Sequence, residues 1–189
     1  MFAGHFALAA AVRSKSQRVP LWALMLGTQL IDILFVPLYL TNYETIKNVT
    51  DSNYGEGIIY AFYSHSLIGT LFIAFLAGLL SSCFWGRKGS LIFGSVIFSH
   101  WLLDLLVHRK DLAIFPGNLG ELPLLGFGLW KYERISILIE SALIIGGAYM
   151  YFKYVLLRGE ENKNQWSIGA GTVMAFLLML SLISDVMGI

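Results

Sequence analysis

The chain has little charge, a single cysteine and no extended basic patch. Only 13% of its 189 residues are charged, whereas a soluble domain of this size carries about 25% charged residues. The single Cys83 excludes an internal disulfide. The net charge is +1 and the basic residues occur only in short loops, so we expect no nucleic-acid partner.

Long apolar runs dominate what remains of the sequence. Hydrophobic residues make up 57% of the chain, and several windows reach the roughly 20 apolar residues that one bilayer crossing requires. The pattern predicts an all-α fold, a polytopic transmembrane helical bundle, with residues 1–189 as a single integral membrane domain. We expect a short N-terminal half-helix over residues 2–12 and five full spans, over residues 20–40, 58–85, 90–107, 132–156 and 166–187.

Two segments need a separate interpretation. The apolar stretch FAGHFALAAAV precedes Arg13, Lys15 and Arg18, whereas a signal peptide places its basic residues before its apolar core. We therefore expect the N-terminal segment to be retained. Residues 116–130 are rich in glycine and leucine, which predicts a loop or a re-entrant element rather than a continuous helix.

The distribution of basic residues predicts an orientation. If residues 13–18 face the cytoplasm, eight basic residues lie on that side and five lie outside, as the positive-inside rule favours. The inner set is Arg13, Lys15, Arg18, Arg87, Lys88, Lys153, Arg158 and Lys163. The outer loops then also carry the acids Glu44, Asp51, Glu56, Asp111, Glu121 and Glu133.

All four histidines lie in or beside apolar stretches, and two acids accompany them. Ionisable groups at membrane depth are costly, so they mark a functional site by default. Imidazole and carboxylate groups are also ligands for zinc and similar divalent ions. The combination indicates a metal site inside a membrane protein. Its candidate residues are His5, His65, His100, His108, Asp32 and Asp104.

Four ionisable residues on separate predicted helices lie at a common depth. At about 1.5 Å of rise per residue, Asp32, His65, His100 and Glu140 all fall roughly 10–13 Å beneath the outer surface. The N-terminal segment places His5 roughly 12 Å above the cytoplasmic face. His5 can join the others if that segment enters the bundle as a half-helix, which is permitted where it is buried in protein.

The segment SHWLLDLLVH carries three of the candidates at helical spacing. His100, Asp104 and His108 are four residues apart in turn, so they lie on one helical face. Asp104 can be a metal ligand or can accept the proton of a histidine ligand and orient it. More ordinary interpretations are that His108 is an interfacial anchor and that Asp32 and Glu140 pair with buried donors.

Several short motifs resemble those of the YdjM-like bacterial inner-membrane proteins, which are regarded as metal-dependent hydrolases. The motifs, in chain order, are MFAGH, QLIDI, YSHSL, SHWLLDLLVHRKDL, GFGLW and ILIESAL. The resemblance covers residues 1–150 and implies an inner-membrane location. The ligands that it implies are His5, Asp32, His65, His100 and Asp104, with Glu140 and His108 as further members.

The chain departs from that family at two places. Better-known members have an acid-rich DxDH-like pattern after the first span and a histidine-rich HRGxTHS segment. Only Asp32 and a lone His65 stand at those places here. The departure favours one metal ion over two.

The preferred hypothesis is a zinc-dependent hydrolase that acts on an amphiphilic or lipid-like ester, leaning to a phosphoester, in the outer half of the bilayer. A metal lowers the pKa of bound water toward about 7, and a buried carboxylate can act as general base. The sequence does not determine the oligomeric state. The expected metal ligands are His5, His65, His100, Asp104 and His108, and the expected catalytic acids are Asp32 and Glu140.

Two other classes of function stay open. A channel or carrier for a divalent cation or for protons would use the same groups as a relay, although it should show a polar path to both faces and often an inverted repeat. A non-enzymatic scaffold would use its buried polar groups only to specify helix packing.

Overall fold

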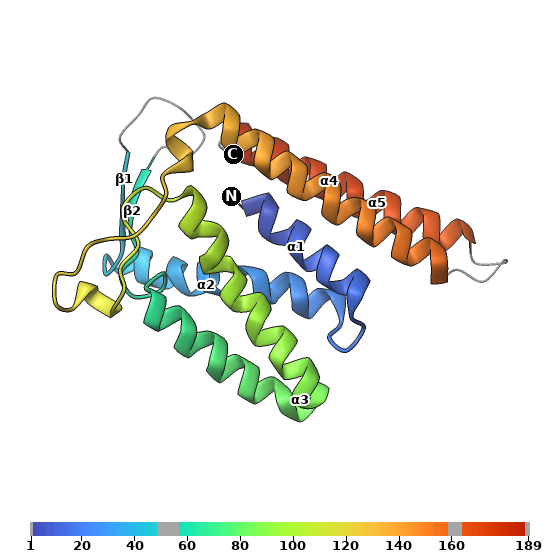
Figure 1. The fold of residues 1–189 in the computed structure, drawn as a ribbon, viewed down its shortest axis with the longest axis horizontal. Helices are drawn as coiled ribbons and strands as arrows, with labels where there is room; N and C mark the ends of the chain where they lie inside the picture. Colours follow the sequence, from blue (N-terminus) through green and yellow to red (C-terminus); the bar gives the residue numbers. More distant parts are fainter. Residues whose placement is uncertain (1, 49–56, 159–163, 188–189) are drawn as a thin grey trace.

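The computed structural model describes residues 2–48, 57–158 and 164–187, and it confirms the predicted all-α class. Five helices make up most of the described chain (Figure 1). Two short strands, β1 (Thr45–Asn48) and β2 (Gly57–Tyr60), and two 3₁₀ turns, η1 (Pro116–Asn118) and η2 (Leu129–Lys131), lie between them. The helices are α1 (Phe2–Lys15), α2 (Leu21–Leu40), α3 (Leu67–Val107), α4 (Glu133–Arg158) and α5 (Asn164–Met187).

Four helices, α2 to α5, are long and apolar enough to cross a membrane. Their outward faces are apolar as well: Phe72, Phe75, Leu138 and Phe176 each expose more than half of their surface. A helix that is hydrophobic on all sides belongs in a membrane or in a large core. The protein is therefore an integral membrane protein.

Helix α3 is a hairpin of two arms rather than one rod. A straight helix of its 41 residues would extend about 60 Å, twice the roughly 30 Å of a bilayer core. Gly86 breaks it with a φ of 62°, a left-handed conformation that glycine adopts without steric cost. A Cβ at Gly78 would lie 3.5 Å from the Cα of Gly94, so the two arms pack backbone to backbone.

The arms of α3 correspond to the two spans predicted over residues 58–85 and 90–107. The predicted start of the first span was wrong, because residues 57–60 form β2 and the helix begins at Leu67. Strand β2 pairs with β1 in antiparallel register, with Thr45 opposite Tyr60. A short apolar run such as GIIY suits a strand as well as a helix start, and the pairing with β1 decides between them.

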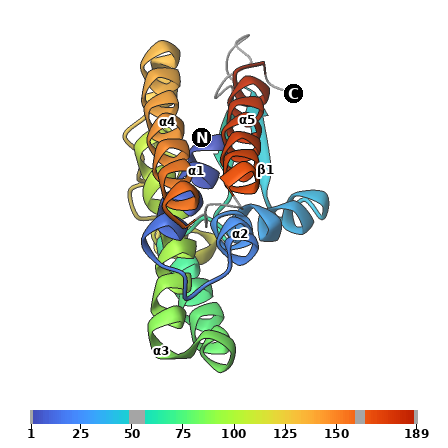
Figure 2. The ribbon, with the colours of Figure 1, turned by 90° about the vertical axis from the view of Figure 1, so that its right-hand side faces the viewer.

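Helix α1 is a short helix enclosed by the others. It packs against α2, α3, α4 and α5, and Figure 2 shows it between these helices. Its buried face is built from small residues, among them Ala3, Ala7 and Ala10. Gly147 of α4 faces that surface so closely that a Cβ there would collide with the Ala7 carbonyl oxygen. The predicted N-terminal half-helix thus enters the bundle.

The two ends of the bundle differ. The strands and the long connection from His108 to Tyr132 lie at one end, and the α1–α2 connection and the turn of α3 lie toward the other (Figure 1). The connection has only two 3₁₀ turns and an isolated bridge between Leu112 and Leu125, as predicted for residues 116–130. The side chains singled out in the sequence meet near the end with the strands.

Candidate metal centre

The centre is built around Asp104, on the second arm of α3. His100 lies one turn earlier on the same helix, and its Nε2 is 3.0 Å from Asp104 Oδ2. Both side chains are buried. Helical periodicity alone brings this pair together, because residues four apart are neighbours on one face.

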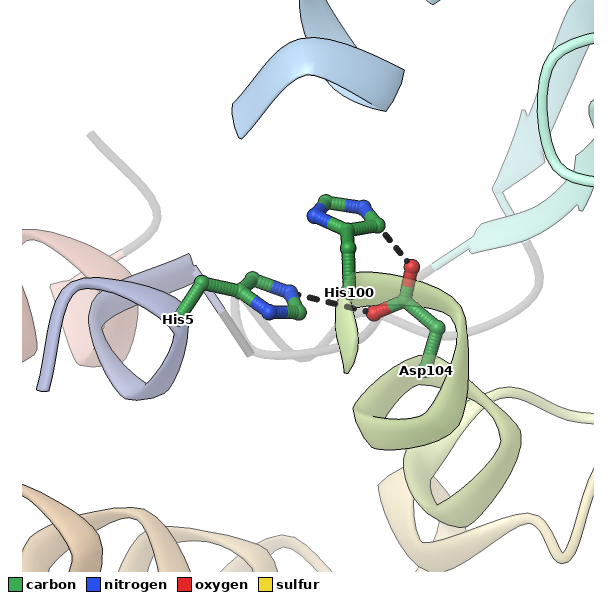
Figure 3. A group of neighbouring side chains, drawn as sticks. All are labelled: His5, His100 and Asp104. Atoms are coloured by element: carbon green, nitrogen blue, oxygen red, sulfur yellow. Dashed lines mark ion pairs between the residues drawn. The ribbon is translucent and has the colours of Figure 1, made fainter. Parts of the chain in front are cut away.

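Three further elements add ligand atoms to the pair. His5 of α1 places its Nε2 3.3 Å from Asp104 Oδ1, so the two carboxylate oxygens face different histidines (Figure 3). His65, which precedes α3, places its Nε2 3.6 Å from Asp104 Oδ2 and 3.3 Å from Asp32 Oδ1. Asp32 of α2 is also 3.5 Å from His100 Nε2. We call His5, Asp32, His65, His100, Asp104 and His108 the acid–histidine cluster.

The spacing within the cluster fits a metal ion. Zinc bonds of about 2.0–2.1 Å in a tetrahedron separate neighbouring ligand atoms by about 3.3 Å. The contacts among Asp32, His65, His100 and Asp104 span 3.0–3.6 Å. Two overlapping groups, His5–His100–Asp104 and Asp32–His65–His100, each hold their ligand atoms within 4.8 Å of one another. The buried His and Asp groups are thus placed to bind a metal ion.

The protonation of His100 is set by its surroundings. Its Nδ1 lies 2.6 Å from the carbonyl oxygen of Thr28, and a carbonyl can only accept. Nδ1 therefore carries a proton, which leaves Nε2 as the ring atom that could bind a metal ion when the ring is neutral. That buried Nε2 makes no hydrogen bond within the described chain despite its 3.0 Å distance to Asp104 Oδ2. A metal ion would satisfy this atom.

His65 is oriented by a chain of two residues. The buried Glu44 carboxylate accepts hydrogen bonds from the Ser64 hydroxyl at 2.7 Å and from the amides of Tyr63 and Ser64 at 2.8 Å each. Ser64 has one hydroxyl proton and gives it to Glu44, so its oxygen accepts from His65 Nδ1 at 2.8 Å. The Nε2 of a neutral His65 then directs a lone pair toward Asp32 and Asp104.

His108 repeats the pattern one turn beyond Asp104. Its Nδ1 lies 3.0 Å from Asp111 Oδ1, and Asp111 Oδ2 accepts from the amide of Ile59 at 2.9 Å. Its Nε2 is 3.9 Å from Asp104 Oδ2, farther than the Nε2 atoms of the other histidines. His108 therefore lies at the edge of the cluster, where Trp130 covers its ring at 4.5 Å.

Glu44 and Asp111 lie in the connections between helices where the sequence placed them, but both are buried. Glu44 has no exposed surface and Asp111 is only 1% exposed. Each orients a histidine, directly or through Ser64. Their positions in polar loops gave no signal of this role, because only the folded loops bring them beside His65 and His108.

The shared arrangement has an electrostatic consequence. Three neutral imidazoles turn lone pairs toward two carboxylates, which is unfavourable without a cation between them. If His65, His100 and His108 were all protonated instead, three positive charges would repel one another. The ring centroids of His65 and His100 are 5.5 Å apart, and those of His65 and His108 are 6.1 Å apart. A divalent ion among the Nε2 atoms would offset both carboxylates, as would a proton on one histidine. Histidine ligands of metals characteristically donate their other ring N–H to a carbonyl or carboxylate, as these three do.

Glu140 lies elsewhere. Its Oε1 accepts a hydrogen bond from the amide of Gly4 at 2.9 Å, and Asp185 Oδ2 accepts from the amide of Ala3 at 3.1 Å. The two acids, from α4 and α5, thus satisfy the first amides of α1, which have no partner within that helix. The structure brings six of the seven predicted site residues together. The seventh, Glu140, lies outside the cluster and bonds Gly4, the residue before His5.

A cavity of about 160 Å³ opens onto the cluster. Asp32 is its most accessible polar group, with 38% of the side chain exposed, whereas Asp104 is 5% exposed. The rim is apolar, formed by side chains from α1, α2, β2 and η2. These rim residues are Phe2, Phe35, Ile59 and Trp130.

Comparison of the chain with family models, with curated proteins and with solved structures found no match. The resemblance to the YdjM-like proteins stays a prediction from the residues.

Proposed function

We propose that the protein is a membrane-embedded, zinc-dependent hydrolase of an amphiphilic ester, with a phosphoester as the preferred substrate class. The observation that carries the proposal is the set of histidines whose Nδ1 atoms are held by outer acceptors while their Nε2 atoms converge on Asp32 and Asp104. This arrangement is typical of metal ligands. The resemblance noted above adds a bacterial inner membrane as the proposed location.

The residues take different roles in this proposal. His65, His100 and Asp104 would hold the ion, with His5 as a further ligand on the other oxygen of Asp104. A bound zinc ion supplies a water molecule that is nucleophilic at neutral pH. Asp32 would accept the proton of the attacking water, because it is the more exposed carboxylate of the cluster and lines the cavity.

The surroundings of the cavity support an amphiphilic substrate. Its lining combines apolar side chains with carboxylates and imidazoles. A lipid-like ester can place its polar junction in such a cavity and leave its hydrocarbon among the exposed apolar side chains of the helices. We propose this class over small soluble esters for that reason.

Transport of an ion is less well supported. An apolar core cluster that includes Ala9, Ala23, Leu24 and Val96 packs α1, α2 and α3 together on the predicted cytoplasmic side of the acid–histidine cluster. A transporter needs a polar path to both faces, and these side chains offer no polar group for one.

Elemental analysis tests the metal centre. Wild-type protein purified with zinc in the buffer should hold zinc in stoichiometric amount, and His65→Ala and His100→Ala should each lose most of it. Ser99→Ala is the matched control, since that hydroxyl donates to the Val96 carbonyl one turn earlier on the same helix. Full zinc in both histidine variants, or none in the wild type, would refute the ligand assignment.

Hydrolysis is tested separately. Wild-type protein in detergent should cleave a short-chain phospholipid at its phosphoester bond and should lose this activity with EDTA and recover it with zinc. Cleavage of the matched carboxyl ester alone would reject the preferred substrate class. A zinc-loaded protein that cleaves neither would reject the hydrolase and leave the metal centre standing.

A further inference from the structure

A second pocket lies at the opposite end of α1 from His5. It has a volume of about 340 Å³ and is formed by the last turns of α1 and α4 with the residues that follow α1. The lining includes Lys15, Gln17, Lys153, Tyr154 and Arg158. At about 1.5 Å per residue, the ten residues from His5 to Lys15 separate this pocket from the metal centre by about 15 Å. None of its residues belongs to the cluster.

Two guanidinium groups are held at the pocket by one aromatic ring. The Arg13 guanidinium lies 5.8 Å from the centroid of the Tyr154 ring, and that of Arg158 lies 5.5 Å from it. Arg13 also donates to the carbonyl of Val19 at 3.1 Å, and Arg158 donates to the Tyr154 hydroxyl at 3.4 Å. The ring and these bonds restrict both side chains, which lowers the entropy cost of binding an anion there.

Four cationic side chains thus gather at one place: Arg13, Lys15, Lys153 and Arg158. Within residues 2–48, 57–158 and 164–187, no ion pair involves any of them. The C-terminal ends of α1 and α4 offset part of the repulsion, since that end of a helix favours cations. An anion between the two helices would offset the remainder.

The pocket is suited to a lipid more than to a soluble anion. Tyr149 and Leu157 beside it are 65% and 77% exposed, so they offer apolar surface next to the charges. The cations lie on the side predicted to face the cytoplasm, and basic pockets between transmembrane helices on that side bind anionic headgroups. We infer that this pocket binds the phosphate of an anionic phospholipid of the inner leaflet.

Lipid binding by the full-length protein tests this inference. Native mass spectrometry of protein titrated with phosphatidylglycerol or phosphatidylcholine should show preferential retention of phosphatidylglycerol. The double variant Lys153→Gln/Arg158→Gln should weaken phosphatidylglycerol binding by roughly tenfold to thirtyfold. The matched control Arg87→Gln/Lys88→Gln removes the same charge at the turn of α3, outside the pocket, and should change binding less than twofold.

Three results would overturn the inference. They are equal retention of both lipids, equal loss in the two double variants, and displacement of phosphatidylglycerol by millimolar inorganic phosphate, which would assign a site for free phosphate. If the pocket variant does not fold, as judged by its melting temperature, Lys15→Gln replaces it with an expected loss of roughly fivefold.

Discussion

The two sides of the candidate metal centre hold their histidines in different ways. On the α3 side, His65, His100 and His108 each have an Nδ1 bonded to an acceptor outside the cluster. On the α1 side, the buried Nδ1 of His5 has no hydrogen-bond partner within the described chain. Its ring instead stacks on His100, with centroids 4.0 Å apart and planes at 11°.

The difference shows two means of orienting a ligand. Hydrogen bonds orient the rings on the α3 side, whereas the position of a whole helix orients His5. Glu140 and Asp185 hold the first amides of α1, and the close packing of Gly147 on Ala7 sets the distance between α1 and α4. Substitutions that disturb the hydrogen bonds on the α3 side should therefore change zinc affinity by a different amount from substitutions that disturb the position of α1.

The largest effect is expected for Asp104→Asn, because Asp104 joins the two sides. One oxygen faces His5 and the other faces His100, and an amide offers neither the charge nor two acceptors. Zinc affinity should fall by more than roughly a thousandfold, beyond the 10–100-fold typical of residues that only orient a ligand. Competition with a calibrated zinc chelator measures it.

Asp111→Asn is the matched control for that variant. It makes the same chemical change one turn beyond His108. Its side chain bonds His108, the histidine at the edge of the cluster, and the Ile59 amide. Its effect should be the smaller of the two, and equal losses would contradict the central position given to Asp104.

Ser64→Ala should come next, because it breaks the connection between Glu44 and His65 while keeping both residues. Loss of a residue that orients a ligand costs roughly 10–100-fold in metal affinity. Ser81→Ala serves as control, since that buried hydroxyl donates to the Gly78 carbonyl on the first arm of α3. Unchanged zinc affinity in Ser64→Ala would show that hydrogen bonding does not orient His65.

His5→Ala should have a smaller effect than His100→Ala. His5 contacts one oxygen of Asp104, whereas His100 contacts both carboxylates of the cluster. We expect a loss of roughly tenfold in zinc affinity, at the lower end of the range for supporting groups. A complete loss of zinc would instead make the α1 side as essential as the α3 side.

Glu140→Gln should have the smallest effect. The amide oxygen can still accept from the Gly4 amide, so α1 and His5 should stay in place. Zinc affinity and hydrolysis should both remain within roughly threefold of wild type, because the hydrogen bond to Gly4 is kept and its strength should change by less than about 1 kcal/mol. Loss of hydrolysis with normal zinc content would restore Glu140 as the general base predicted from the sequence.

Much of the centre could be predicted because its members lie in apolar runs. Asp32, His65, His100 and Asp104 interrupt or border such runs, where an unpaired ionisable group is costly. Glu44, Ser64 and Asp111 could not be found in this way, since acids and serines are ordinary in polar loops. Their burial depends on where those loops fold over the end of the bundle.

The sequence by itself determined the class of the protein and most of the ionisable residues that meet in the acid–histidine cluster. Length and hydropathy require membrane-crossing helices, and helical spacing places His100 beside Asp104. Only the tertiary structure decided which acids orient the histidines, where α3 begins, and that Glu140 supports α1. These outcomes depend on contacts between segments far apart in the chain, and no local pattern of residues specifies such contacts.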